Sequence, residues 1–148
     1  MVDASPSKPE TTLTEKRRDD EAPAVIAKLG WRYHHVGIPT DVPRQDEVYI
    51  AQFKMYVSGF SSSPYGIEWM RFEPDCPLPD LIQTVPHVAF EVDDLEAALQ
   101  KAALQGKEVI FPPGSPSEGV RAAMIVHNGA PVELIAFRGG CLGEKNRL

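Results

Sequence analysis

Apolar and polar residues alternate over residues 87–92 and then change to a helical spacing. The apolar members of 87–92 share one face of an extended chain, and His87 opens the strand on the other face. Over 95–103 the apolar residues recur at intervals of three and four, which predicts an amphipathic helix that Gly106 ends. A strand that opens with a histidine therefore leads directly into a helix.

The same pattern occurs a second time, upstream. Residues 35–41 align with 87–93 without a gap, and residues 66–72 align with 131–137 in the same way. Each half of the chain thus opens on a strand that begins with histidine and closes on a strand that contains glutamate, which is an internal repeat. The repeated chemical groups are His35, Glu68, His87 and Glu133.

The two halves differ in length. The histidine and the glutamate of the second half are 46 residues apart, whereas those of the first half are 33 apart. The difference matches the predicted helix at 93–107, so we expect the first half to have a shortened helix or none. A short helix at 24–29, which Gly30 would end, could cover the sheet that this loss leaves bare.

The repeat predicts an α+β fold made of two βαβββ-type modules. A dense run of prolines separates the halves and disfavours any regular element there. The first residues are too polar to bury enough surface to offset the entropy of ordering, so we expect a disordered tail. The expected boundaries are a tail over 1–22, one domain over 23–138, with module one at about 31–73, a linker at 74–85 and module two at about 86–138, and a C-terminal tail over 139–148.

Two local predictions concern the first module. Residues 48–60 alternate as a strand does, with Lys54 and Tyr56 on one face, and a turn then joins this strand to the next one. Because adjacent strand residues point to opposite faces, His34 and His35 are not expected to face the same site. The alignment of the repeats selects His35.

Composition narrows the possible partners. The net charge is −6 and the isoelectric point is near 5.2, which argues against a nucleic-acid partner. No apolar run approaches the roughly 20 residues that would cross a bilayer, so no membrane partner is expected. The two cysteines form no disulfide framework, and the first residues do not resemble a secretory signal, which predicts a cytoplasmic location.

The repeated residues suit a metal ion. If the two modules are related by a pseudo-twofold axis, two imidazoles and two carboxylates meet in one concavity. These groups are ligands for a borderline divalent ion such as Zn, Ni, Co, Mn or Fe. An ionised glutamate inside an apolar strand is costly unless it is paired or bound to a cation, and here it occurs twice at the same repeat position.

With these motifs, residues 32 to 137 resemble the vicinal oxygen chelate superfamily, the group of glyoxalase I, methylmalonyl-CoA epimerase, extradiol dioxygenases and bleomycin-resistance proteins. The resemblance implies a curved, barrel-like mixed sheet in which each module supplies one metal ligand from its first strand and one from its last. It thereby implies one divalent metal ion bound by His35, Glu68, His87 and Glu133.

The resemblance also implies a function. We expect a divalent-metal-dependent isomerase or lyase that acts on a small substrate with two adjacent oxygens through an enediolate-like intermediate, with Glu68 or Glu133 moving the proton. Lys54, Tyr56 and Arg121 are candidates for binding an anionic substrate, although ordinary strand-surface positions also explain them. Because relatives of this size often pair, we expect a homodimer.

Two other functions stay open at this stage. One is a non-catalytic module that binds a small molecule of the antibiotic type, as bleomycin-resistance proteins do, although those proteins lack such a ligand set. The other is an iron-dependent extradiol-type dioxygenase, in which two histidines and one glutamate bind iron. A fourth protein ligand would crowd the oxygen site, so this function ranks below an isomerase or lyase.

Overall fold

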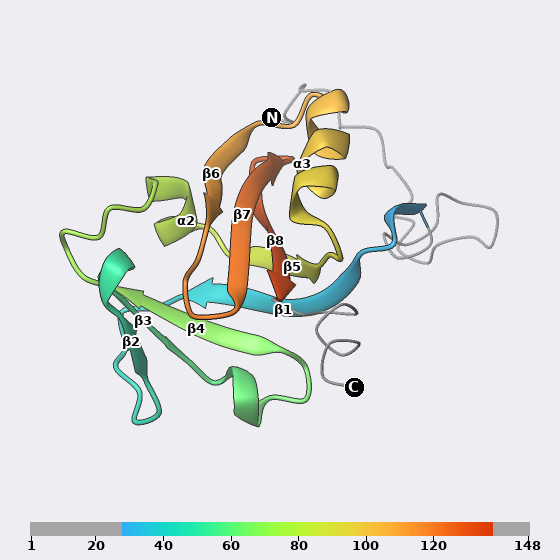
Figure 1. Cartoon of the computed structure of the whole chain (residues 1–148). Coiled ribbons are helices and arrows are strands. Elements are labelled where there is room, and N and C mark those ends of the chain that lie inside the picture. The colour runs from blue at the N-terminus through green and yellow to red at the C-terminus, as the bar shows by residue number, and fades with distance from the viewer. Residues whose placement is uncertain (1–27, 138–148) are drawn as a thin grey trace, which may run out of the picture.

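A computed structural model describes residues 28–137, in which eight strands form one curved mixed sheet (Figure 1). The strand order is β2-β3-β4-β1-β5-β8-β7-β6. The predicted tails at 1–22 and 139–148, and most of the predicted helix at 24–29, lie outside the described residues. The strands are β1 (Arg32–Pro39), β2 (Val48–Ile50), β3 (Met55–Ser58), β4 (Ile67–Phe72), β5 (His87–Glu91), β6 (Val109–Gly114), β7 (Val120–His127) and β8 (Ala130–Phe137).

The sheet confirms the two-module fold. Strands β1 and β5 pair antiparallel at its centre, β4 lies parallel to β1, and β8 lies parallel to β5. The registers of the outer pairs are equivalent, because Gly37 pairs with Glu68 in one module and Ala89 pairs with Glu133 in the other. The gapless alignment of the repeats therefore corresponds to equivalent positions in space.

The modules differ in their crossover helices, as predicted. Helix α3 (Leu95–Leu104) joins β5 to β6, and the Asp94 side chain caps it by accepting a hydrogen bond from the Ala97 N–H. In the first module, the only helices among the described residues between β1 and β4 are the single-turn 3-10 helices η1 (Ala51–Phe53) and η2 (Phe60–Ser62). In the described range no helix is long and apolar enough to cross a membrane.

Two local predictions are wrong. Residues 48–60 do not form one strand, because the chain turns at η1 and continues with Lys54 at a left-handed φ of 50°, so that β2 and β3 form a hairpin. The proline-rich linker contains the short helix α2 (Asp80–Thr84), which begins directly after Pro79. A proline is compatible with the start of a helix, since its ring already holds φ near a helical value.

The main apolar core lies between the sheet and α3. It contains the buried side chains of Trp31, Leu95 and Leu134, and Leu29 packs against it. In the described residues, the segment before β1 therefore packs on the helix layer of the second module. The expectation that a helix at 24–29 covers the bare sheet of the first module concerns residues that lie mostly outside the described range, and it stays a prediction.

The connection from β1 to β2 contacts the outer face of the first module, which is the face opposite Glu68. The Arg44 guanidinium lies 5.8 Å from the centre of the Trp69 ring, and Glu47 accepts two hydrogen bonds from Arg71 at 2.7 and 2.8 Å. These contacts lie at the position that the crossover helix α3 occupies in the second module. The first module is thus covered by a short loop with cation–π and ionic contacts.

Replacing Leu134 by Ala is expected to destabilise the protein by about 2–5 kcal/mol, because the side chain is completely buried in the main core. Urea unfolding followed by circular dichroism measures this loss. The matched control is Leu104→Ala, since Leu104 is 89% exposed and its truncation should change the free energy of unfolding by less than about 0.5 kcal/mol. Equal losses in the two variants would contradict the described core.

Candidate metal centre

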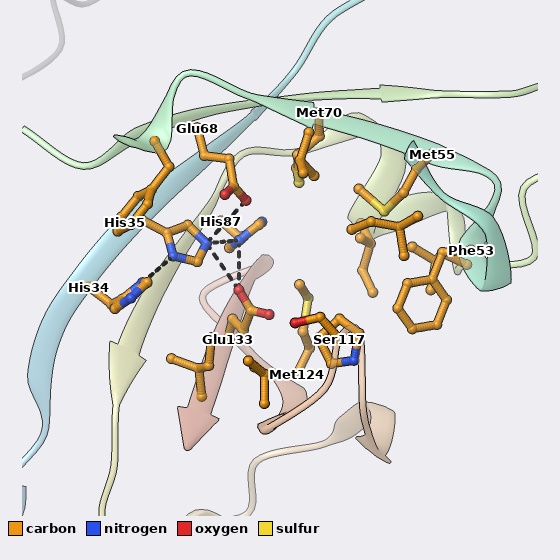
Figure 2. A pocket seen from close by; sticks show the side chains of 18 of the residues that line it. His34, His35, Phe53, Met55, Glu68, Met70, His87, Ser117, Met124 and Glu133 are labelled. Carbon is orange, nitrogen blue, oxygen red and sulfur yellow. Dashed lines mark hydrogen bonds and ion pairs between the residues drawn. The ribbon is translucent and has the colours of Figure 1, made fainter. Parts of the chain in front are cut away.

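Four central strands bring the repeated residues together on the inner face of the sheet (Figure 2). His35 comes from β1, Glu68 from β4, His87 from β5 and Glu133 from β8. The Nε2 atoms of the two histidines are 3.1 Å apart. Glu133 Oε1 lies 3.1 Å from His35 Nε2 and 3.2 Å from His87 Nε2. Three donor atoms on three strands thus form a nearly equilateral triangle.

This triangle fits a divalent ion. Adjacent ligand atoms around an ion with ligand distances of roughly 2.1 Å are themselves about 3 Å apart, and the three donors already have this spacing. Glu68 lies at the edge of the group, with Oε1 3.7 Å from His35 Nε2. His35, His87 and Glu133 can therefore hold an ion together, and Glu68 stands beside them.

The two carboxylates have different electrostatic surroundings. Burial alone would raise the pKa of Glu133, but hydrogen bonds from His35 and His87 outweigh it and lower the pKa to about 2. Burial raises the pKa of Glu68, which the charges of the nearby histidines only partly offset. Glu133 is thus held as an anion, whereas Glu68 accepts a proton more readily.

A glycine makes room for one of the histidine rings. In the antiparallel pairing of β1 with β5, Gly37 is opposite His87, and Ala89 is opposite His35. A Cβ atom on Gly37 would lie only 2.2 Å from Cε1 of His87. The missing side chain therefore lets the His87 ring lie directly on the β1 backbone.

His34 does not obey strand alternation. The pairing of β1 with β5 shifts by one residue between Tyr33 and His35, which is the signature of a β-bulge at His34. The bulge turns His34 to the side of His35, where it lines the same cavity, and the two Nδ1 atoms are 2.7 Å apart. The expectation that only one of the two adjacent histidines faces the site is therefore wrong.

The three predicted substrate-binding residues lie outside this cavity. Lys54 pairs with Asp75, Tyr56 lies under the Arg71 guanidinium, and Arg121 Nη1 is 2.6 Å from Glu96 Oε1. The predicted alternation within β3 is correct, but in both β3 and β7 the apolar face of the strand is the one that lines the cavity. The prediction that these polar side chains line the cavity is wrong.

The cavity has a volume of about 340 Å³ and mostly apolar walls. Among the described residues, the side chains that line it include neither Lys nor Arg. Helix α2, which the proline pattern concealed, contributes the buried Ile82. Methionines and phenylalanines make up much of the remaining wall: Phe53, Met55, Phe60, Met70, Met124 and Phe137.

The sequence profile of the Glyoxalase/Bleomycin resistance protein/Dioxygenase superfamily matches residues 27–134, and the chain belongs to this family. A comparison with curated proteins gave no match.

Two solved structures have the same fold. A hypothetical protein from Bacillus halodurans is similar with a TM-score of 0.59 and 16% identity, over 73% of this chain and 95% of that one. Methylmalonyl-CoA epimerase from Mycobacterium tuberculosis is similar with a TM-score of 0.55 and 16% identity, over 76% of this chain and 91% of that one. At this identity the likeness concerns the fold.

Proposed function

We propose that the protein is a divalent-metal-dependent isomerase or lyase of the glyoxalase and epimerase type. The observation that carries the proposal is the triangle of His35, His87 and Glu133 with a second carboxylate, Glu68, next to it. The triangle supplies an ion site, and the second carboxylate supplies a base. The family contains enzymes of this kind, which supports the assignment.

The chemistry follows from these roles. A bound divalent ion supplies a Lewis acid for the two adjacent oxygens of a substrate. Glu68 removes a proton from the carbon next to the substrate carbonyl, and the electron pair of the broken C–H bond moves to the carbonyl oxygen. The resulting anion is enediolate-like. Glu68 then returns the proton to the same carbon or to the neighbouring one.

The cavity walls support a substrate with a largely apolar body. Methionine and aromatic side chains surround the histidines and carboxylates, and the described lining contains no Lys or Arg that would pair with a phosphate or a second carboxylate. A charged group on the substrate would therefore lose hydration without gaining a partner. We propose a compact ketone or aldehyde with a neighbouring hydroxyl group.

A second candidate rests on the same triangle. Two histidines and one carboxylate with open positions also form the ligand set of non-haem iron oxygenases. The position of Glu68 beside the triangle favours the isomerase or lyase, since an oxygenase needs free space there. Oxygen uptake with catechol and ferrous iron would support the oxygenase, and its absence together with proton exchange would support the isomerase or lyase.

The metal content of the purified protein tests the proposal first. Protein prepared without chelator is expected to carry about one equivalent of a divalent metal by elemental analysis. Replacing His35 or His87 by Ala should remove most of this metal, since each supplies a nitrogen of the triangle. The control is His127→Ala, an exposed histidine that contacts Lys107.

A wild-type protein that binds no zinc, nickel, cobalt, manganese or iron would overturn the proposal and leave the small-molecule binding module. Pairing of two copies stays a prediction.

A further inference from the structure

His34 is fixed in two directions inside the cavity. Its Nδ1 atom lies 2.7 Å from Nδ1 of His35. Its ring stacks on Phe60, with 4.7 Å between the ring centres and 14° between the planes, and it also contacts the Phe137 ring at 5.4 Å. The bulge and the aromatic stack therefore hold the His34 ring so that its Nδ1 atom faces His35 at a fixed position.

The contact between the two Nδ1 atoms has a chemical consequence. Two ring nitrogens at 2.7 Å share one hydrogen, so one ring donates and the other accepts. His35 faces the triangle with Nε2, and a nitrogen that binds a metal carries no proton. A neutral His35 then has its proton on Nδ1 and donates it to Nδ1 of His34.

The second histidine of the triangle has no such partner. Within residues 28–137, Nδ1 of His87 is the one buried side-chain nitrogen or oxygen without a hydrogen bond. The pseudo-symmetry of the modules therefore does not extend to the groups that orient the two histidines. His35 is oriented by a neighbouring ring, whereas His87 is oriented by packing on Gly37.

We infer that His34 is a positioning residue that fixes the tautomer and the ring orientation of His35 for metal binding. The inference rests on the proposed metal site and concerns residues outside the ligand set. Partners of this kind make a ligand histidine more basic, and their loss typically lowers metal affinity about 10- to 100-fold.

Three variants separate hydrogen bonding from shape. His34→Phe keeps an aromatic ring for the stack on Phe60 but removes the acceptor, and His34→Asn restores an acceptor oxygen near the position of Nδ1. His127→Phe is the matched control, since it replaces an exposed histidine on β7. Zinc affinity is measured by competition with a chelator, and the ring protons are assigned by nitrogen–proton NMR of the zinc-loaded protein.

The expected result is a fall in zinc affinity of about tenfold or more in His34→Phe, with recovery in His34→Asn and no change in His127→Phe. In the wild-type protein, His35 should carry its proton on Nδ1, and the signal should show a hydrogen bond that His34→Phe loses. Circular dichroism checks that each variant is folded.

Three results would overturn the inference. The first is a zinc affinity of His34→Phe within about threefold of the wild type. The second is an equal loss of zinc affinity in His34→Phe and His34→Asn. The third is a wild-type His35 that is protonated on Nε2 in the zinc-loaded protein. The first two leave the proposed function intact, because zinc still binds. A wild-type protein that binds no metal removes both the proposed function and the role of His34.

Discussion

A Glu68→Gln variant is expected to lose proton exchange at a carbon next to a carbonyl by a factor of about 100 or more, which is the usual contribution of a general base, and to keep most of its metal. Glu68 lies 3.7 Å from the nearest histidine nitrogen and outside the triangle. Glutamine has the same shape and removes only the basic oxygen. The loss should therefore appear in the reaction and not in the metal content.

Glu133→Gln is the matched comparison, since it makes the same chemical change at the equivalent position of the repeat. Glu133 contacts both histidines, so the loss of its charge should weaken metal binding itself. Exchange is measured by NMR in deuterium oxide with 2-hydroxyacetophenone as the probe, and metal is measured by elemental analysis. Equal metal loss in both variants would contradict the division of roles.

A Gly37→Ala variant is expected to lose at least about tenfold in zinc affinity while it stays folded. The new methyl group would lie 2.2 Å from Cε1 of His87, well below an ordinary contact distance, so the ring has to move. A ring at the end of a side chain can move without unfolding the sheet. Its Nε2 atom then leaves the place that completes the triangle.

The control for this variant is the pseudo-equivalent position. Ala89 is opposite His35 as Gly37 is opposite His87, and Ala89→Gly removes a methyl group without creating a clash. Chelator competition measures zinc affinity, and thermal unfolding measures stability. A Gly37→Ala protein with wild-type affinity would show that His87 is not held by its contact with the β1 backbone.

Much of the candidate site could be predicted from the sequence, because a gapless repeat conserves strand parity. His35 and His87 are aligned positions of the equivalent strands β1 and β5, and Glu68 and Glu133 occupy equivalent registers, so their convergence followed from the repeat. The same repeat predicted the missing crossover helix from a difference in length. Neither inference required knowledge of individual contacts.

Other features could not be predicted because they depend on contacts between segments that are far apart in the sequence, or because no typical turn residue marks them. The bulge at His34 exists only in the pairing of β1 with β5, so alternation within one strand could not predict it. The turn at Lys54 lacks a glycine or asparagine that would have marked it. Lys54 and Tyr56 were candidates for binding an anionic substrate in the cavity, yet the cavity is lined by the apolar face of β3.

The placement of the two carboxylates bears on stereochemistry. Figure 2 shows Glu68 and Glu133 on opposite sides of the histidine pair. Inversion at a carbon is simplest with two mobile acids, one taking a proton from one face and one delivering a proton to the other. Here Glu133 is held by both histidines, so in the proposed reaction Glu68 alone would exchange protons, on a single face of the substrate. Such a centre would favour a proton shift between neighbouring carbons over inversion at one carbon, and it would form a product of one handedness.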